Sequence, residues 1–144
     1  MTSATQQRPI ADGLFTWPAG SPALLGSRCQ TCDKVAFPAQ GSCTACCSTD
    51  VKVEELPARG KLWTYTIQRF MPKSPYNSGE TQETFKPYGV GYVELPGALC
   101  VEGRLTESDP EKLKIGMDMD VIFYPYRNEA DGTEVISFAF QPVA

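Results

Sequence analysis

The sequence predicts a mostly β protein in which a small cysteine-bearing ribbon precedes a closed barrel of five short strands. Four of the six cysteines form two Cys-x-x-Cys pairs within residues 29–46. Five β-rich segments follow, separated by turn residues, and closing such strands into a barrel removes the exposed edges of an open sheet. We therefore expect an arm at 1–26, the ribbon at 27–56 and the barrel at 57–144.

The expected arm has no periodic pattern. Its stretch DGLFTWPAGSPALLGS holds prolines and glycines too close together for a helix. The apolar side chains of the arm either pack on their own domain or contact another protein, because aromatic residues are enriched at interface centres. Both alternatives remain open. The candidate partner contacts are Phe15 and Trp17, together with Phe37 and Pro38 after the first cysteine pair.

The cysteine block has the spacing of a metal site. Cys29 and Cys32 form one tight turn, Cys43 and Cys46 form another, and two such turns face to face place four thiolates at tetrahedral corners, as in structural zinc sites. The intervening DKVAFPAQGS is long enough for a strand, a turn and a return strand. Because all four ligands are protein sulfurs, no position remains for water or substrate, and we expect a structural ion. Iron is the rival metal, since tetrahedral sulfur suits both.

The other cysteines and the lack of histidine argue against independent catalysis. We expect Cys47 to be a small buried residue where the chain turns away, and Cys100 to pack in the core. Without histidine, the chain alone can form no Ser-His-Asp or Cys-His arrangement. Asp118 and Asp120 alternate along a strand, which favours a solvated face over acid–base chemistry.

The first barrel strand is expected at 60–70, GKLWTYTIQRF. Trp63, Tyr65 and Ile67 alternate with polar residues there and predict the half-buried face of the strand. The polar loop 71–86 follows, and loops of this length are uncommon unless they are functional or disordered.

Four more strands complete the expected barrel. They lie at 88–95, 98–105, 120–127 and 135–140. Pro96-Gly97 is the turn of the hairpin formed by the first two. SDPEKLK (108–114) reads as one helical turn, capped by Ser108 or Asp109, with Pro110 at the first helical position.

Composition and charge limit the possible functions. The chain of 144 residues is 42% hydrophobic, which is normal for a globular protein. Residues 1–90 hold nine Lys/Arg against seven Asp/Glu, whereas residues 91–144 hold four against ten. Nucleic-acid binders usually carry a basic stripe, so we expect no nucleic-acid partner. We expect any anion to be bound by a few basic residues within 1–90.

The N-terminus and the hydropathy pattern predict the compartment. No apolar run is long enough to span a membrane, and MTSATQQRPIADGLF lacks the features of a secretory signal. Cys-x-x-Cys pairs without an export signal indicate a reducing compartment, where thiols stay free to bind metal and disulfides are disfavoured. We therefore expect a cytoplasmic protein without a membrane partner.

The order of motifs resembles the acyl-CoA-associated zinc-ribbon/OB-fold family, long known as a domain of unknown function. The resemblance is carried, in order, by LLGSRCQTCDKVAFP, CTAC, ARGKLWTYTI, PYGVGYVELPGALCVEGRL and KIGMDMDVIF. It implies a rubredoxin-like zinc ribbon followed by a five-stranded OB-fold barrel. Three features depart from the family pattern: Asp33 and Cys47 stand where glycine is usual, and the arm replaces an N-terminal helix.

The resemblance also implies a function. Members of the family are accessory subunits of thiolase-superfamily enzymes, whose catalytic cysteine and histidines lie on the partner. The implied role is to help bind acyl-CoA and to stabilise a hetero-oligomer with two copies of each subunit. The arm is most similar to that of subunits that serve aromatic or steroid acyl-CoA degradation, such as benzoylsuccinyl-CoA thiolysis. By itself the chain would not be an enzyme.

Coenzyme A, as a ligand shared with the partner, would need basic residues for its phosphates. The candidates are Arg28, Lys34, Arg69 and Lys73, with Tyr76 of the loop against the pantetheine or acyl path. The alternative for each basic residue is an ordinary solvated surface charge.

Two other classes of function remain open. An OB barrel can bind single-stranded nucleic acid through aromatic stacking, here by Trp63 and Tyr65, although the acidic C-terminal strands argue against it. A rubredoxin-like electron carrier would hold iron in place of zinc.

Overall fold

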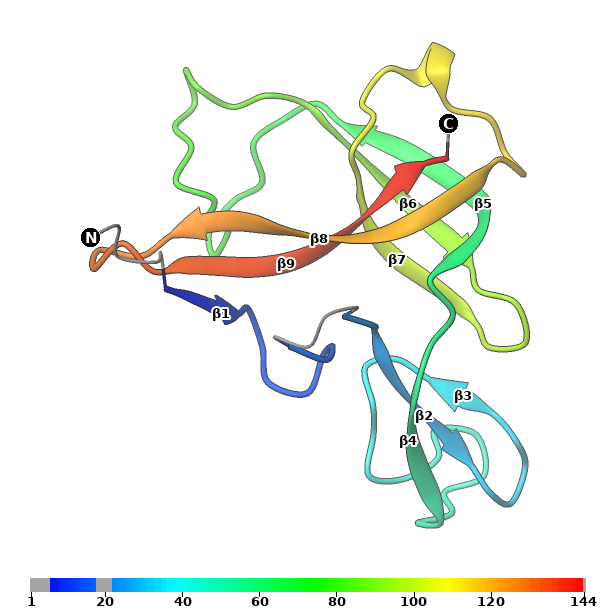
Figure 1. Cartoon of the computed structure of the whole chain (residues 1–144). Helices are drawn as coiled ribbons and strands as arrows, with labels where there is room; N and C mark the ends of the chain where they lie inside the picture. The colour runs from blue at the N-terminus through cyan, green and yellow to red at the C-terminus, as the bar shows by residue number, and fades with distance from the viewer. Residues whose placement is uncertain (1–5, 18–21, 144) are drawn as a thin grey trace.

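The computed structural model describes residues 6–17 and 22–143 (Figure 1). The strands are β1 (Gln7–Pro9), β2 (Leu25–Cys29), β3 (Val35–Ala36), β4 (Val51–Glu55), β5 (Arg59–Gln68), β6 (Tyr88–Glu94), β7 (Cys100–Leu105), β8 (Asp118–Asn128) and β9 (Glu134–Pro142). Within these ranges the one helical element is the 3-10 turn η1 (Pro110–Lys112). No helix in the described part of the chain is long and apolar enough to cross a membrane.

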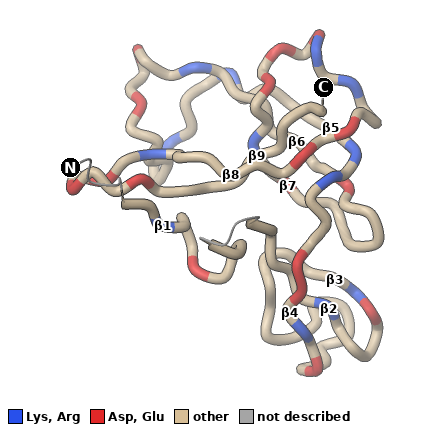
Figure 2. The backbone as a smooth tube through the Cα atoms, viewed as in Figure 1, with Lys and Arg blue, Asp and Glu red and all other residues tan. Residues whose placement is uncertain are grey.

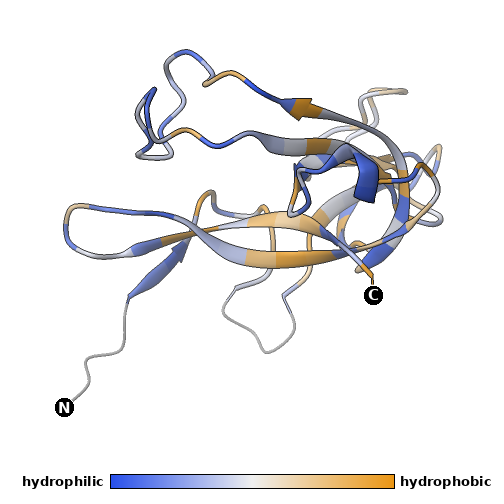
Figure 3. Ribbon diagram, turned by 90° about the horizontal axis from the view of Figure 1, so that it is seen from above, coloured by the Kyte–Doolittle hydropathy of each residue, from blue (hydrophilic) through white to orange (hydrophobic). Residues whose placement is uncertain are grey.

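Five strands close into the expected barrel. The sheet order is β9-β7-β6-β5-β8, and the pairing of β8 with β9 closes the ring. All neighbours are antiparallel except β7 and β9, which pair in parallel after the crossover through η1, β8 and the β8–β9 turn. Asp109 caps η1 and accepts a bond from the backbone N–H of Glu111, as predicted. The longest apolar stretches lie along strands of the barrel, whereas much of the loop surface is hydrophilic (Figure 3).

A bulge in β5 corrects one sequence-based expectation. The register with β6 shifts between Leu62 and Thr64, so that Leu62 is fully buried, whereas Tyr65 and Ile67 pack against the core after the shift. Trp63 therefore points outward and is 59% exposed, contrary to the expected common face. A bulge adds one residue to a strand, which reverses the alternation of inward and outward side chains.

The core runs through the barrel, and two glycines make room for it. The ring of Phe140 is fully buried and lies edge-on to Phe138, with ring centroids 6.0 Å apart. A Cβ on Gly103 would stand 2.6 Å from the Phe140 ring, so β7 can pass over the aromatic pair only without a side chain there. A Cβ on Gly60 would stand 2.3 Å from the backbone oxygen of Glu94. Glycine at this position therefore lets β5 begin tight against β6.

The ribbon is a three-stranded sheet in the order β3-β2-β4. It packs on the barrel and shares its core, because Leu24, Val35 and Leu56 belong to the same buried cluster as the barrel residues. Phe37 meets Phe138 edge-to-face with centroids 5.7 Å apart. The ribbon and the barrel are consequently joined by a continuous apolar contact.

The arm differs from the irregular segment expected. β1 pairs in parallel with β9 on the outside of the barrel, and β2 already begins at Leu25. Phe15 bridges to Leu24 and packs on Phe123 with ring centroids 4.8 Å apart, which leaves it 4% exposed. Of the two alternatives for this aromatic residue, packing on its own chain is the one observed. Residues 18–21, with Pro18 and Gly20, lie outside the described residues.

Candidate functional site

The four predicted cysteines come together in the ribbon. The Sγ atoms of Cys29, Cys32, Cys43 and Cys46 all lie within 4.8 Å of one another. Cys29 and Cys46 are 3.6 Å apart at sulfur, and Cys32 and Cys43 are 3.5 Å apart. A tetrahedral zinc with Zn–S bonds of about 2.3 Å has sulfur–sulfur edges of about 3.8 Å, so the cluster fits that ion. A closed set of four thiolates supports a structural role for the ion.

In each cysteine pair, a backbone N–H group donates to the sulfur of the first cysteine and so favours its binding to a cation. The backbone N–H of Cys32 donates to the Cys29 sulfur at 3.4 Å, and that of Cys46 donates to the Cys43 sulfur at 3.4 Å. These bonds are the main cause that lowers the pKa of Cys29 to about 6 and also lowers the pKa of Cys43. Amide donors aimed at sulfur stabilise the thiolate, the form that binds a metal.

Both turns end in a residue with positive φ. Asp33 has φ 69° and Cys47 has φ 65°, and their N–H groups donate to the carbonyls of Cys29 and Cys43. This conformation explains why glycine would suit both positions. Cys47 is exposed, contrary to the expectation that it is buried. Cys100 is also exposed, since it alternates with the buried Val101 at the start of β7.

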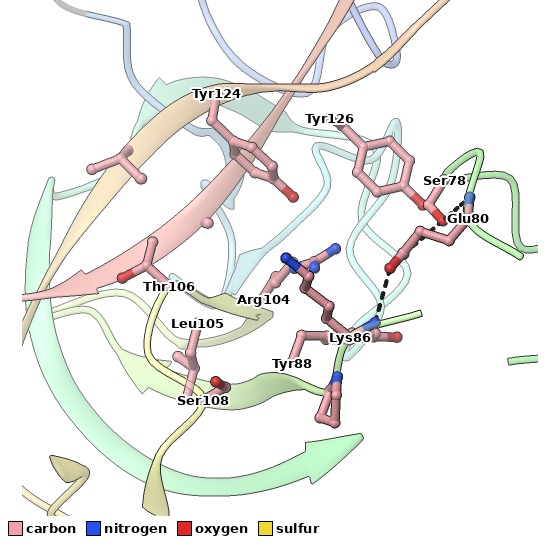
Figure 4. A pocket seen from close by; sticks show the side chains of 13 residues that line it. Ser78, Glu80, Lys86, Tyr88, Arg104, Leu105, Thr106, Ser108, Tyr124 and Tyr126 are labelled. Carbon is pink, nitrogen blue, oxygen red and sulfur yellow. Dashed lines mark hydrogen bonds between the residues drawn. The ribbon is translucent and has the colours of Figure 1, made fainter. Parts of the chain in front are cut away.

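A second feature lies at the barrel, between the loop 71–86 and strands β6, β7 and β8. It is a cavity of about 510 Å³ (Figure 4). Its walls are formed by Ser78, Glu80, Lys86, Pro87, Tyr88, Arg104, Leu105, Thr106, Ser108, Ile122, Tyr124, Tyr126 and Ala139. Volumes of this size are typical of small-molecule sites.

A neighbouring cavity of about 430 Å³ shares four of these side chains. The shared residues are Tyr88, Arg104, Tyr124 and Tyr126. The Arg104 guanidinium stands over the Tyr88 ring, 4.3 Å from its centroid. One arginine and three tyrosines therefore border both cavities.

The sequence patterns do not predict this cavity. Tyr124 and Tyr126 fall on the same side of β8, which the FYPYR pattern indicates, but Arg104 is distant in sequence. Only the closure of β8 onto β9, and of β9 onto β7, places these side chains around one space. The charge distribution predicted that any anion would be bound by residues 1–90, whereas Arg104 lies in the acidic segment 91–144.

The five residues expected to contact coenzyme A are not gathered at one place. Arg28 donates to Glu54, to Asp33 and to the carbonyl of Gly97, so its guanidinium is already engaged. The other three basic residues are Lys34, Arg69 and Lys73, and all three are exposed. Within the described ranges, none of them forms an ion pair or lines either cavity. Tyr76 is the one that lines a cavity, the smaller of the two.

The four candidate partner contacts have different surroundings. Phe15 is a core residue of this chain, and Trp17 lies edge-on to it with ring centroids 6.3 Å apart. Trp17 and Phe37 are half-buried, and Pro38 is exposed. Trp17 and Phe37 both pack against the core that the ribbon shares with the barrel.

The aromatic residues considered for nucleic-acid stacking do not form one platform. Trp63 lies outside and meets Tyr92 edge-to-face at 6.2 Å, while Tyr65 packs against the core. Tyr92 donates to the carboxylate of Glu102. In the described part of the chain, charges of both signs are spread along the backbone tube and form no continuous basic stripe (Figure 2). A phosphate backbone would therefore find no complementary track.

A closed four-cysteine ribbon on a five-stranded OB barrel defines this chain as a zinc-ribbon/OB-fold protein. The family model described as the rubredoxin-like zinc ribbon domain of ChsH2 matches residues 16–52. The model of the C-terminal OB-fold domain of ChsH2 matches residues 53–123. The chain belongs to this family, also known as DUF35, and the resemblance inferred from the motifs is confirmed.

Three similar proteins illustrate the range of the family. A DUF35 domain-containing scaffold protein of Methanothermobacter thermautotrophicus is 30% identical, over 83% of this chain and 86% of its own. The benzoylsuccinyl-CoA thiolase subunit BbsA of Thauera aromatica is 27% identical, over 85% and 78%. The solved structure of the Ltp2-ChsH2(DUF35) aldolase superposes with a TM-score of 0.60 and 27% identity, over 85% of this chain and 86% of that one.

Proposed function

We propose that this protein is a non-catalytic accessory subunit of a thiolase-superfamily acyl-CoA enzyme, in which it helps to hold acyl-CoA and stabilises the complex. The observation that carries the proposal is the similarity to BbsA, a thiolase subunit, over 85% of the chain. The similarity to the Ltp2-ChsH2(DUF35) aldolase structure supports the same kind of role. Degradation of an aromatic or steroid acyl-CoA in the cytoplasm, such as benzoylsuccinyl-CoA thiolysis, is the proposed setting.

The chemistry of the chain supports an accessory role. An ion held by the four cysteines would have only protein sulfurs as ligands, so it would offer no position to a substrate. The chain has no histidine, and Asp118 and Asp120 are paired with Lys61 and Arg59 across β5 and β8. Bond making and breaking would therefore belong to the partner.

The proposed contacts follow from which groups are accessible. Lys34, Arg69 and Lys73 are exposed, and as compact or forked cations they suit the phosphates of coenzyme A. Arg28 would join them only by exchanging its present carboxylates, and Tyr76 would line the pantetheine or acyl path. Trp17, Phe37 and Pro38 are the proposed partner contacts, and Phe15 supports Trp17 from the core.

Co-expression with the thiolase-superfamily protein encoded nearest to it tests the proposal. We expect the two chains to co-purify as a hetero-oligomer with two copies of each, and mass measurement of the complex checks this stoichiometry. Thiolysis or retro-aldol cleavage of an acyl-CoA should require both chains. A protein that stays alone beside such partners, or that cleaves an acyl-CoA unaided, would contradict the proposal.

Metal analysis of the purified protein separates this function from an electron carrier. We expect one zinc per chain and no visible colour, because zinc has no redox chemistry. A red, iron-loaded protein would instead favour the rubredoxin-like alternative.

A further inference from the structure

The larger barrel cavity combines cations with aromatic walls. Arg104 and Lys86 both point into it, from β7 and from the end of the loop 71–86 (Figure 4). Leu105, Ile122 and Ala139 give it an apolar floor. A pocket with an apolar floor and a few convergent polar groups is the usual form of a small-molecule site.

The charges in the cavity are not balanced. Glu80 is the carboxylate among its lining residues, and its oxygens accept bonds from Tyr76, Ser78 and the backbone N–H of Lys86. Among the described residues, no carboxylate lies within ion-pair distance of the Arg104 guanidinium. Two cations against one engaged carboxylate leave a net positive charge for an incoming anion.

The tyrosines add flat surfaces and hydrogen-bond donors. Tyr88 holds the Arg104 guanidinium over its ring, which orients that cation toward the cavity. Tyr124 and Tyr126 line the wall formed by β8. Burial raises the pKa of both, so their hydroxyls stay protonated at neutral pH and can donate to an anion.

We propose that this cavity binds a ligand that combines an anionic group with a planar ring, with Arg104 as the anchoring charge and Tyr124 and Tyr126 beside the ring. Two parts of an aromatic acyl-CoA have this chemistry. One is the nucleotide end, with its phosphates and adenine, and the other is an acyl group that carries both an aromatic ring and a free carboxylate. The inference rests on the proposed function for these two sources, but it concerns binding by this chain alone.

Calorimetric titration of the full-length, metal-loaded protein tests the proposal with two probes. AMP represents the nucleotide end, and benzoylsuccinate represents an aromatic acyl group with free carboxylates. We expect at least one probe to bind, and the one that binds identifies the source. Arg104→Gln should weaken that binding about tenfold or more, because hydrogen bonds to charged groups are among the stronger ones. Lys86→Gln should weaken it less, since Lys86 is exposed.

Arg59→Gln is the matched control. Arg59 is an arginine of the same barrel, but it pairs with Asp120 and lines neither cavity, so its loss should leave the affinity unchanged. Lys86→Gln remains informative if Arg104→Gln fails to fold, because it changes an exposed side chain. Failure of both probes to bind the unaltered protein overturns the proposal, as does an affinity that neither cavity variant reduces. Co-purification with the partner is a separate readout, so it can succeed when this proposal fails.

Discussion

Two residues of the ribbon hold a backbone conformation that L-amino acids usually avoid. Asp33 and Cys47 each follow a cysteine pair and close its turn with positive φ. A Cβ atom crowds the following carbonyl in this region, at a cost of roughly 1–2 kcal/mol, although Asp tolerates it better than most residues. Cys47 is therefore the more strained of the two.

Cys47→Gly should stabilise the protein. Removing the side chain relieves the left-handed strain, and the larger freedom of glycine in the unfolded chain offsets part of the gain, so we expect the free energy of unfolding to rise by about 1 kcal/mol. Denaturant titration measures the change, and metal analysis should still find a full site. Cys46→Ser is the contrasting variant, which should lose the metal. Loss of metal from the Cys47 variant instead would show that the ligand had been assigned to the wrong cysteine.

Gly60→Ala should destabilise the barrel. The added Cβ would lie 2.3 Å from the carbonyl oxygen of Glu94, and neither backbone can move without disturbing the β5–β6 pairing. Such overpacking typically costs about 1–3 kcal/mol, which thermal and denaturant unfolding would detect. Gly41→Ala is the control, because its Cβ would meet nothing within 4 Å. Equal stability of the two variants would contradict the close approach of β5 and β6.

At the level of elements, the loop 71–86 is folded around one carboxylate of its own, Glu80, and is joined to the barrel by a cluster of rings. Tyr76 donates to Glu80 at 2.7 Å and Ser78 donates to the same oxygen at 2.8 Å. Tyr76 also stacks on Tyr88, the first residue of β6, with ring centroids 6.4 Å apart. These contacts give a long polar loop a defined path along the cavity.

Acid should loosen this loop through Glu80. The hydrogen bond from Tyr76 is the main cause that lowers the pKa of Glu80. A lowered pKa means that the contribution to stability is complete above the unfolded value, about 4.3, and is lost as the pH falls through the folded value. Glu80→Gln should therefore speed proteolysis within 71–86 at neutral pH, and the difference from the unaltered protein should shrink in acid.

Glu83→Gln provides the control for that measurement. Glu83 belongs to the same loop and is exposed, and within the described part of the chain its carboxylate has no hydrogen-bond partner. Its replacement removes the same charge without removing the anchor. Equal proteolysis of the two variants would mean that Glu80 does not hold the loop.

At the scale of the whole molecule, the ribbon and the barrel depend on a common core. Leu24, Val35 and Leu56 of the ribbon region are buried with Leu62 and Phe140 of the barrel. The ribbon itself is small, and its strands β3 and β4 flank only the five residues of β2. A sheet of this size needs a cross-link such as a metal site to stay folded.

Removal of the metal should therefore affect both parts. A chelator, or the replacement of Cys32 and Cys46 by serine, should unfold the ribbon and lower the melting temperature of the barrel, because the barrel loses the apolar cover that the ribbon supplies. Circular dichroism and NMR dispersion measure the two effects, and zinc added after chelation should restore both. The serine variant should not respond to zinc. A chelated protein with an unchanged melting temperature would contradict the shared core.

Local patterns were enough to predict much of this molecule. The spacing of Cys29, Cys32, Cys43 and Cys46 predicts their convergence, because two tight turns leave the sulfurs few other arrangements. Five strands with a short helical turn before the fourth were expected and are confirmed, since β-formers and turn residues alternate clearly after residue 56. The order of the motifs also identified the family.

The tertiary structure alone decided where several side chains lie. A bulge, which has no reliable signature in the sequence, turns Trp63 outward, and packing on Phe123 draws Phe15 into the core. The cavity of Arg104 and Tyr124 exists only because barrel closure joins strands that are distant in the chain. Local sequence determines short-range geometry through spacing and alternation, whereas a site assembled across strands depends on register and closure, which no single segment encodes.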